Sequence, residues 1–145
     1  MKTEIEKYHP CEDAVEFRRQ YATFADAWAA CPRGDWMLWI AKKAGVNLRT
    51  LTLAKGLCAE TVIHLMKDER SRNAVRVAIA YGKGEATDEE LSAARAAYAA
   101  ARAAYPAAYA AAYAAADAAL AANQQQTADI CREVLTDEIM KLIYN

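Results

Sequence analysis

Glu60 and His64 are the residues whose types and spacing come closest to those of an acid–base catalytic pair. They stand four residues apart in a segment that is expected to be helical, so both side chains would lie on one face of the helix. The pair is not part of a His-Glu-x-x-His motif, and the chain's other histidine is far away in the sequence. We therefore interpret the two residues as a solvated pair and predict no catalytic residues. An enzyme with an unrecognised site is the least favoured alternative, and a deep polar cleft at this pair would support it.

The residues that can bind metal ions are scattered along the chain. The cysteines include no Cys-x-x-Cys pair, the spacing on which many structural zinc sites are built. His9 and Cys11 are close in sequence, but they would need distant partners to hold an ion. We expect Cys11, Cys31, Cys58 and Cys131 to be free thiols, mostly buried as small hydrophobic residues. The sequence thus predicts no metal and no cofactor.

Three arginines, Arg70, Arg72 and Arg76, follow the acidic residues Asp68 and Glu69. They can grip an acidic partner or form a solvated face with the neighbouring carboxylates, and we favour the solvated face. The chain has no glycine-rich phosphate loop and no nucleophile elbow. The commonest nucleotide-binding and hydrolase motifs are therefore absent from the sequence.

The composition gives no sign of nucleic-acid or membrane binding. The chain has 145 residues with 18 basic and 19 acidic side chains, so no basic excess favours a phosphate backbone. The N-terminal residues lack the apolar core of a signal peptide, and the stretch rich in alanine and tyrosine inserts poorly into lipid. We therefore expect a cytoplasmic protein with no nucleic-acid and no membrane partner.

Glycine and proline are scarce, strand-like alternation is absent, and good helix formers dominate. The sequence predicts an all-α fold, a single-domain bundle of about six to seven helices over residues 1–145, with residues 1–10 flexible. The expected helices span residues 11–21, 24–31, 36–44, 48–66, 69–81, 88–122 and 127–143. The expected capping residues are Thr23, Asp35, Asn47, Asp68 and Thr127 as N-caps, Thr87 with Glu90 as a capping box, and Gly45 as a helix end.

The segment from Trp36 to Ile40 is apolar nearly all round, which is typical of a helix in the middle of a molecule. Trp36 and Trp39 can line a ligand pocket or pack in the core, and we favour core packing. The predicted core residues are Trp28, Trp36, Leu38, Trp39, Leu57, Cys58 and Val62.

Residues 93–122 include 21 alanines, and projection on a helix places the nine other residues within an arc of roughly 120°. Either the alanine face packs inward and the tyrosines and arginines face solvent, or the tyrosines fill the core. We favour the first alternative, because charged residues share the tyrosine arc and are costly to bury. Pro106 is expected to kink this long alanine-rich helix without breaking it. The predicted interface residues on the arc are Tyr98, Arg102, Tyr105, Tyr109 and Tyr113.

The stretch from Cys31 to Trp39 contains Arg-Gly-Asp-Trp-Met-Leu-Trp. It resembles a group of small bacterial and phage proteins that carry a Gly-Asp-Trp-Met/Leu-Leu-Trp motif followed by an alanine-rich tail. Residues 68–75 and the later Ala-Ala-Tyr tract are also similar to immunity proteins. The resemblance spans residues 24–135 and implies a phage or mobile-element setting, with a toxin-neutralising or anti-defence role by analogy.

The sequence therefore favours a non-catalytic helical protein that binds another protein, as an immunity or anti-defence factor. A surface rich in tyrosine and arginine suits such an interface. A self-assembling structural or virion-associated protein is the alternative, and a homo-oligomer is compatible with either function.

Overall fold

The computed structural model describes residues 2–104 and 120–145, which contain seven α-helices and no strand. The all-α fold predicted from the sequence is confirmed. None of the helices in these two ranges is long and apolar enough to cross a bilayer. The helical elements are η1 (Glu6–Tyr8), α1 (Glu12–Arg19), α2 (Phe24–Ala30), α3 (Gly34–Ala44), α4 (Leu48–Glu60), η2 (Ile63–Leu65), α5 (Glu69–Gly82), α6 (Asp88–Ala104) and α8 (Leu120–Tyr144), where η marks a 3₁₀ turn.

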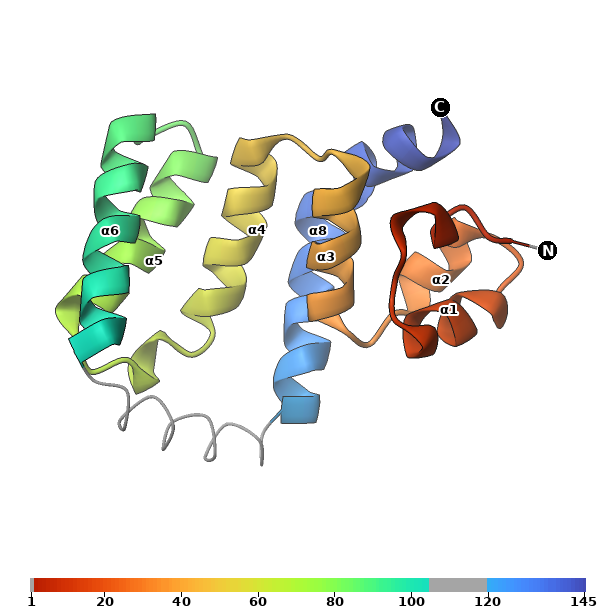
Figure 1. Ribbon diagram of the computed structural model, residues 1–145, viewed down its shortest axis with the longest axis horizontal. Coiled ribbons are helices and arrows are strands. Elements are labelled where there is room, and N and C mark those ends of the chain that lie inside the picture. Colours follow the sequence, from red (N-terminus) through yellow and green to blue (C-terminus); the bar gives the residue numbers. More distant parts are fainter. Residues whose placement is uncertain (1, 105–119) are drawn as a thin grey trace.

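The helices follow one another across the molecule in an order that differs from the chain order (Figure 1). α6 and α5 form a pair at one end, α4 lies beside α5, and α3 and α8 pack together next to α4. α1 and α2 lie at the other end, close to the N-terminus. The C-terminal helix α8 is thus inserted between elements that come from the first half of the chain.

Most of the predicted helix starts are confirmed, because they depend on local hydrogen bonds. The side chains of Thr23, Asn47 and Asp68 each accept a hydrogen bond from a backbone N–H in the first turn of α2, α4 and α5. Thr87 and Glu90 form the predicted capping box, with each side chain bonded to the other residue's backbone N–H. Gly45 ends α3 in the left-handed conformation, with φ of 94°.

The predicted cap at Asp35 is wrong, because α3 begins at Gly34, two residues before the predicted start at Trp36, and its N-cap is Arg33. The Asp35 carboxylate accepts two hydrogen bonds from the Arg33 guanidinium, at 2.8 and 2.6 Å, and so does not cap the helix. Gly34 lies against Thr127 of α8, where a Cβ would come within 2.7 Å of the Thr127 carbonyl carbon. The first residue of α3 thus lies in close contact with a distant helix, which leaves no room for a side chain at this position.

Helix α4 ends at Glu60, well before the predicted end at Met66. The next three residues, Thr61 to Ile63, are β-branched, and the Thr61 hydroxyl donates to the Cys58 carbonyl at 2.7 Å. Val62 leaves the helical region with φ of −120°, and the chain continues as η2. The local side-chain hydrogen bond thus replaces a further turn of helix.

Helix α8 begins by Leu120, so Thr127 is not an N-cap and residues 123–126 do not interrupt the helix. The Thr127 hydroxyl instead donates to the Gln124 carbonyl at 3.0 Å, one turn earlier. Asn123 donates from its side chain to the Thr61 hydroxyl at 3.0 Å. A polar run that looks like a helix breaker is therefore accommodated by a contact with the end of α4.

The main core lies where α8 packs against α3 and α4. Ala128, Cys131, Leu135 and Ile139 recur at helical spacing on α8 and are fully buried. Of the predicted core residues, Trp28 and Cys58 are buried in this cluster. The other five are half-buried: Trp36, Leu38 and Trp39 pack against this cluster, whereas Leu57 and Val62 are not part of it, which differs from the prediction for these two.

The N-terminal segment, for which flexibility was expected, makes specific contacts with α1. Ile5 is buried, and the buried Arg18 guanidinium donates two hydrogen bonds to the Glu4 carboxylate, at 2.6 and 3.0 Å. Burial favours the neutral form of Glu4, but the hydrogen bonds and charge of Arg18 outweigh it and lower the pKa of the carboxyl. The ion pair thus fastens the first residues to α1.

Glu4→Gln is expected to lower the free energy of unfolding by about 1.5 kcal/mol at pH 7, because it removes a charged partner of Arg18. Since the folded pKa of Glu4 is depressed, its contribution is complete above the unfolded pKa of about 4.3 and disappears as the pH falls through the folded value. Urea unfolding of wild type and Glu4→Gln at pH 7 and pH 3 measures this. Glu12→Gln, on the exposed side of α1, is the control. A difference that does not change with pH would show that packing, and not charge, fastens the segment.

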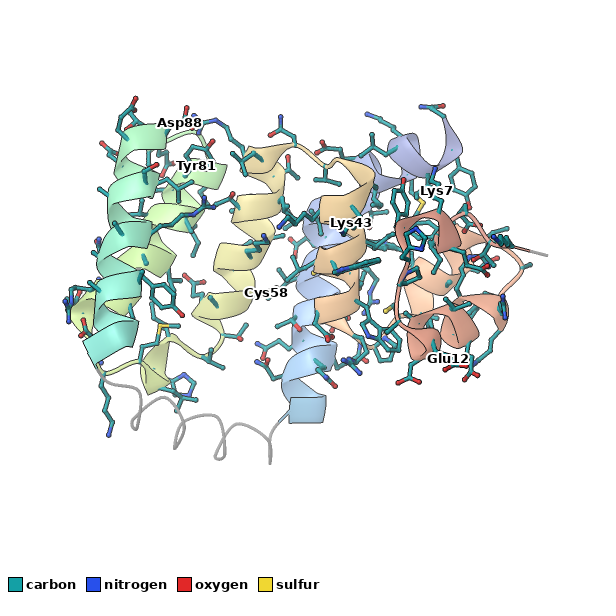
Figure 2. All side chains as sticks on the ribbon, in the orientation of Figure 1. Lys7, Glu12, Lys43, Cys58, Tyr81 and Asp88 are labelled. Atoms are coloured by element: carbon teal, nitrogen blue, oxygen red, sulfur yellow. The ribbon has the colours of Figure 1, made fainter. Side chains whose placement is uncertain are left out.

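A second, smaller core joins α5 to α6, with Tyr81, Ala86 and Leu91 buried in it. The Arg49 guanidinium from α4 stacks 4.2 Å from the centre of the Tyr81 ring and donates to the Tyr81 carbonyl at 2.6 Å. The Tyr81 hydroxyl donates to Asp88 at 2.7 Å, at the end of the pair where Figure 2 labels both residues. These contacts tie the α5–α6 pair to α4.

The described part of α6 agrees only in part with the favoured orientation of the alanine-rich helix, because Arg95 is exposed as expected but several alanines are exposed as well. Leu91 and Ala94 are buried, and Tyr98 shares their face and is half-buried, whereas Ala96 and Ala99 are exposed. Because α6 packs chiefly against α5, one narrow face suffices for the contact and the other alanines face outward. Pro106 and its predicted kink lie outside the described residues.

Candidate functional site

A groove of about 740 Å³ runs between α4 and α8. Its floor is aliphatic and half-buried, formed by Leu53 and Leu57 of α4 and by Ile130 and Val134 of α8. Leu57 was predicted as a core residue from its helical spacing, but α8 covers only one side of it. The groove is an apolar surface that the described helices leave partly open.

The two walls of the groove run antiparallel. Near one end, Asn123 at the start of α8 bonds to Thr61, which follows the end of α4. Near the other end, the Asn47 N–H donates to the Glu138 carboxylate at 2.5 Å. These two contacts join the helices near both ends of the groove.

Charged and polar side chains edge the apolar floor. Glu60 and Glu133 are exposed on its two sides, and Lys83, at the end of α5, is exposed near the Leu53 end. The edge therefore carries more negative than positive charge among the lining residues. This combination of an apolar floor and a polar edge is typical of protein-binding surfaces.

Glu60 and His64 do not form the predicted helical pair. α4 ends at Glu60, and His64 lies in η2 after the chain has turned, so the two residues no longer share a helix face. Both are exposed, and within the described residues no hydrogen bond or ion pair joins them to each other. Within the described residues, Glu60 lines the α4–α8 groove and His64 does not, so the two side chains do not face one common cleft.

Each of the buried cysteines, Cys31, Cys58 and Cys131, donates a hydrogen bond from its thiol to a backbone carbonyl. Cys131 is fully buried in α8 and donates to the Gly34 carbonyl at 3.7 Å, while Cys58 donates to the Thr127 carbonyl at 3.7 Å. The hydrogen bond with Cys58 and burial raise the pKa of the Cys131 thiol. The described residues contain no group of three or more acidic, histidine or cysteine side chains placed to hold a metal ion.

The arginines at the start of α5 bind to their neighbours. Arg70 pairs with Asp68 at 2.9 Å, and Glu69 accepts from Arg72 at 3.4 Å and from Arg76 at 2.6 Å. The guanidinium groups thus already form ion pairs with neighbouring carboxylates, as expected for a solvated face. The arginines are therefore a poor candidate for capturing an acidic partner.

The predicted Tyr/Arg interface falls mostly outside the structure. Tyr98 is half-buried on the side of α6 that carries Leu91 and Ala94. The side chain of Arg102 and all of Tyr105, Tyr109 and Tyr113 lie outside the described residues. Within the part of the chain that can be described, the α4–α8 groove is therefore the better candidate surface. Sequence reasoning missed it because its walls are about 75 residues apart in the chain and each wall alone looks like an ordinary amphipathic helix.

The chain was compared with protein-family models, curated proteins and solved structures, and none of them matches it.

Proposed function

We propose that this protein is a non-catalytic helical binding factor of bacterial or phage origin that acts by binding another protein, as an immunity or anti-defence factor. The observation that carries the proposal is the α4–α8 groove, with its aliphatic floor and acidic edges. The bacterial or phage setting and the immunity or anti-defence role rest on the sequence resemblance noted for residues 24–135 alone.

The groove suits an amphipathic helix of the partner. It extends from Thr50 to Thr61 along α4, a length of about 16 Å at 1.5 Å per residue, which corresponds to about three helical turns. Apolar side chains at spacings of three and four residues would fill the floor between Leu53, Leu57 and Ile130. Lysine or arginine residues on the flanks of that helix would face Glu60 and Glu133.

The test is capture of a partner from host lysate by wild type and by groove variants. Glu60→Lys combined with Glu133→Lys reverses both acidic edges, and Leu57→Ala removes part of the floor. We expect each to weaken binding of the captured protein at least about tenfold, a loss typical of central interface residues. Glu12→Lys combined with Glu16→Lys makes the same charge change on exposed residues of α1 and should leave binding unchanged.

Loss of binding in the groove variants alone would support the proposal. Equal capture by wild type and groove variants would contradict it. If light scattering instead shows that the purified chain assembles with itself and that groove variants abolish the assembly, the protein is the self-assembling structural or virion-associated protein of the alternative.

A further inference from the structure

All three tryptophans and both phenylalanines of the chain line one cavity of about 330 Å³. It lies under the N-terminal segment, between α1, α2 and α3, at the end of the molecule where Figure 2 labels Lys7 and Glu12. None of its lining residues also lines the α4–α8 groove. The aromatic residues of the cavity are Phe17, Phe24, Trp28, Trp36 and Trp39.

The cavity remains open because small side chains lie among the large aromatic ones in its wall. Trp36 packs 6.0 Å from Phe17, and Trp28 packs 5.8 Å from Phe24, measured between ring centres, with the rings tilted. Ala14 of α1 and Ala27 of α2 are the small residues of the wall, which also includes the aliphatic side chains of Ile5, Met37 and Ile40. Protein interiors rarely contain a void larger than a water molecule, and an apolar cavity of about 150 Å³ is enough to bind benzene. The cavity here is about twice that size.

The charges beside the cavity are already paired. Arg18 is bound to Glu4 and also donates to the Tyr21 carbonyl at 2.9 Å. Asp35 is bound to Arg33, whose guanidinium also stacks 4.6 Å from the Trp36 ring. A charged ligand would have to give up its hydration without gaining a free counter-ion from these lining residues.

Two further polar groups lie at the mouth. His9 and Cys11 are exposed there, next to Pro10, and the other cysteine of the wall, Cys31, is buried. His9 has a positive φ of 56°, an uncommon conformation for a residue with a side chain, and its N–H donates to the Glu6 carbonyl at 3.1 Å. At the mouth, the His9 imidazole and the Cys11 thiol can therefore form a hydrogen bond with one polar atom of a ligand whose remaining atoms lie inside the cavity.

We propose that this cavity binds a small neutral aromatic molecule of two fused rings, with one hydrogen-bonding atom directed to His9 and Cys11. The aromatic wall, the volume and the paired charges each favour this class of ligand over an ion or a flexible polar molecule. This site is independent of the groove, so it can be present whether or not the groove binds a protein.

Tryptophan fluorescence reports on ligand binding in this cavity, because all three tryptophans of the chain line it. Quinoline, a neutral two-ring molecule with one acceptor nitrogen, is the probe at pH 7.5. We expect saturable quenching of tryptophan fluorescence and slower alkylation of Cys11 by iodoacetamide. The quinoline-2-carboxylate anion should bind at least tenfold more weakly.

Ala27→Leu fills the cavity and should weaken quinoline binding at least tenfold while retaining the fold. Ala29→Leu is the matched control, since it makes the same change on the exposed side of α2 and should bind like wild type. Ala14→Leu fills the same space from α1 and takes the place of Ala27→Leu in the binding experiment if Ala27→Leu does not fold. Leu57→Ala, in the groove, should bind quinoline unchanged, which separates this site from the proposed protein-binding surface.

Quenching that does not saturate, or equal binding by Ala27→Leu and Ala29→Leu, would overturn the proposal. Failure of both Ala27→Leu and Ala14→Leu to fold would overturn it as well, because an empty cavity accepts added methyl groups. Binding of the carboxylate as tightly as quinoline would show that the site does not select neutral ligands.

Discussion

Replacing Gly82 by alanine is expected to lower the free energy of unfolding by about 3 kcal/mol, a loss typical of overpacking a tight contact. Alanine within a helix normally stabilises by about 0.5–1 kcal/mol relative to glycine. The change in stability expected for Gly82→Ala therefore has the opposite sign to that of an ordinary glycine-to-alanine substitution in a helix. The reason is the approach of α5 to α4. A Cβ at Gly82 would lie 2.3 Å from the Leu53 Cβ and 2.7 Å from its Cα, so the two helices would have to separate.

Urea unfolding followed by circular dichroism measures this effect, and two variants calibrate it. Gly56→Ala should cost less, since a Cβ there would lie 2.9 Å from the Ile79 Cγ1 and 3.1 Å from the Ile79 backbone nitrogen, which are longer distances than those at Gly82. Lys83→Ala, at an exposed position next to Gly82, should be nearly neutral. A Gly82→Ala variant as stable as wild type would mean that α4 and α5 do not pack this closely.

Trp28→Ala should lower the free energy of unfolding by about 4 kcal/mol, as expected for truncating a buried aromatic residue. Trp28 is 4% exposed, packs in the main core, and donates from its indole N–H to the Thr136 hydroxyl of α8 at 2.9 Å. The substitution therefore removes apolar contacts and one of the hydrogen bonds that join α2 to α8.

Two further variants show how much of the stability lost in Trp28→Ala comes from the hydrogen bond and how much depends on burial. Trp28→Phe keeps much of the ring and loses the hydrogen bond, so it should cost clearly less than alanine. Trp36→Ala should also cost less, because Trp36 is half-buried. Denaturant midpoints of the three variants give the comparison, and equal losses for Trp28→Ala and Trp36→Ala would contradict the burial described for these residues.

The parts of the fold that could be predicted from the sequence are those fixed by neighbouring residues. The capping box at Thr87 and Glu90 and the N-cap at Thr23 need partners only three positions away, so the sequence pattern contains the whole interaction. The apolar spacing of Cys131 and Leu135 likewise identifies the buried face of α8 without knowledge of what covers it.

The errors occur where a distant residue decides the outcome. The polar run at the start of α8 looks like a break, but Asn123 bonds to Thr61, 62 positions earlier. The start of α3 at Gly34 likewise lies against Thr127, a residue far away in the sequence. Periodicity shows that Leu57 faces other helices, yet it cannot show that the neighbouring helix leaves a groove.

The aromatic cavity had a signal in the sequence that was not fully used. The chain's phenylalanines and tryptophans all lie between Phe17 and Trp39, although apolar residues are spread over its whole length. A ligand pocket at Trp36 and Trp39 was therefore a reasonable alternative to core packing. Spacing alone did not decide between them, because the empty volume depends on how α1 and α2 dock on α3.

The position of α8 in the bundle affects how the chain can fold as it is synthesised. Trp28 bonds to Thr136, and the carbonyl of Cys31 accepts from Arg132, across more than a hundred residues. α4, α5 and α6 are neighbours in both sequence and space, so they can associate while the rest of the chain is still on the ribosome. α1, α2 and α3 emerge first but cannot close their core until α8 follows, so the region made earliest is completed last.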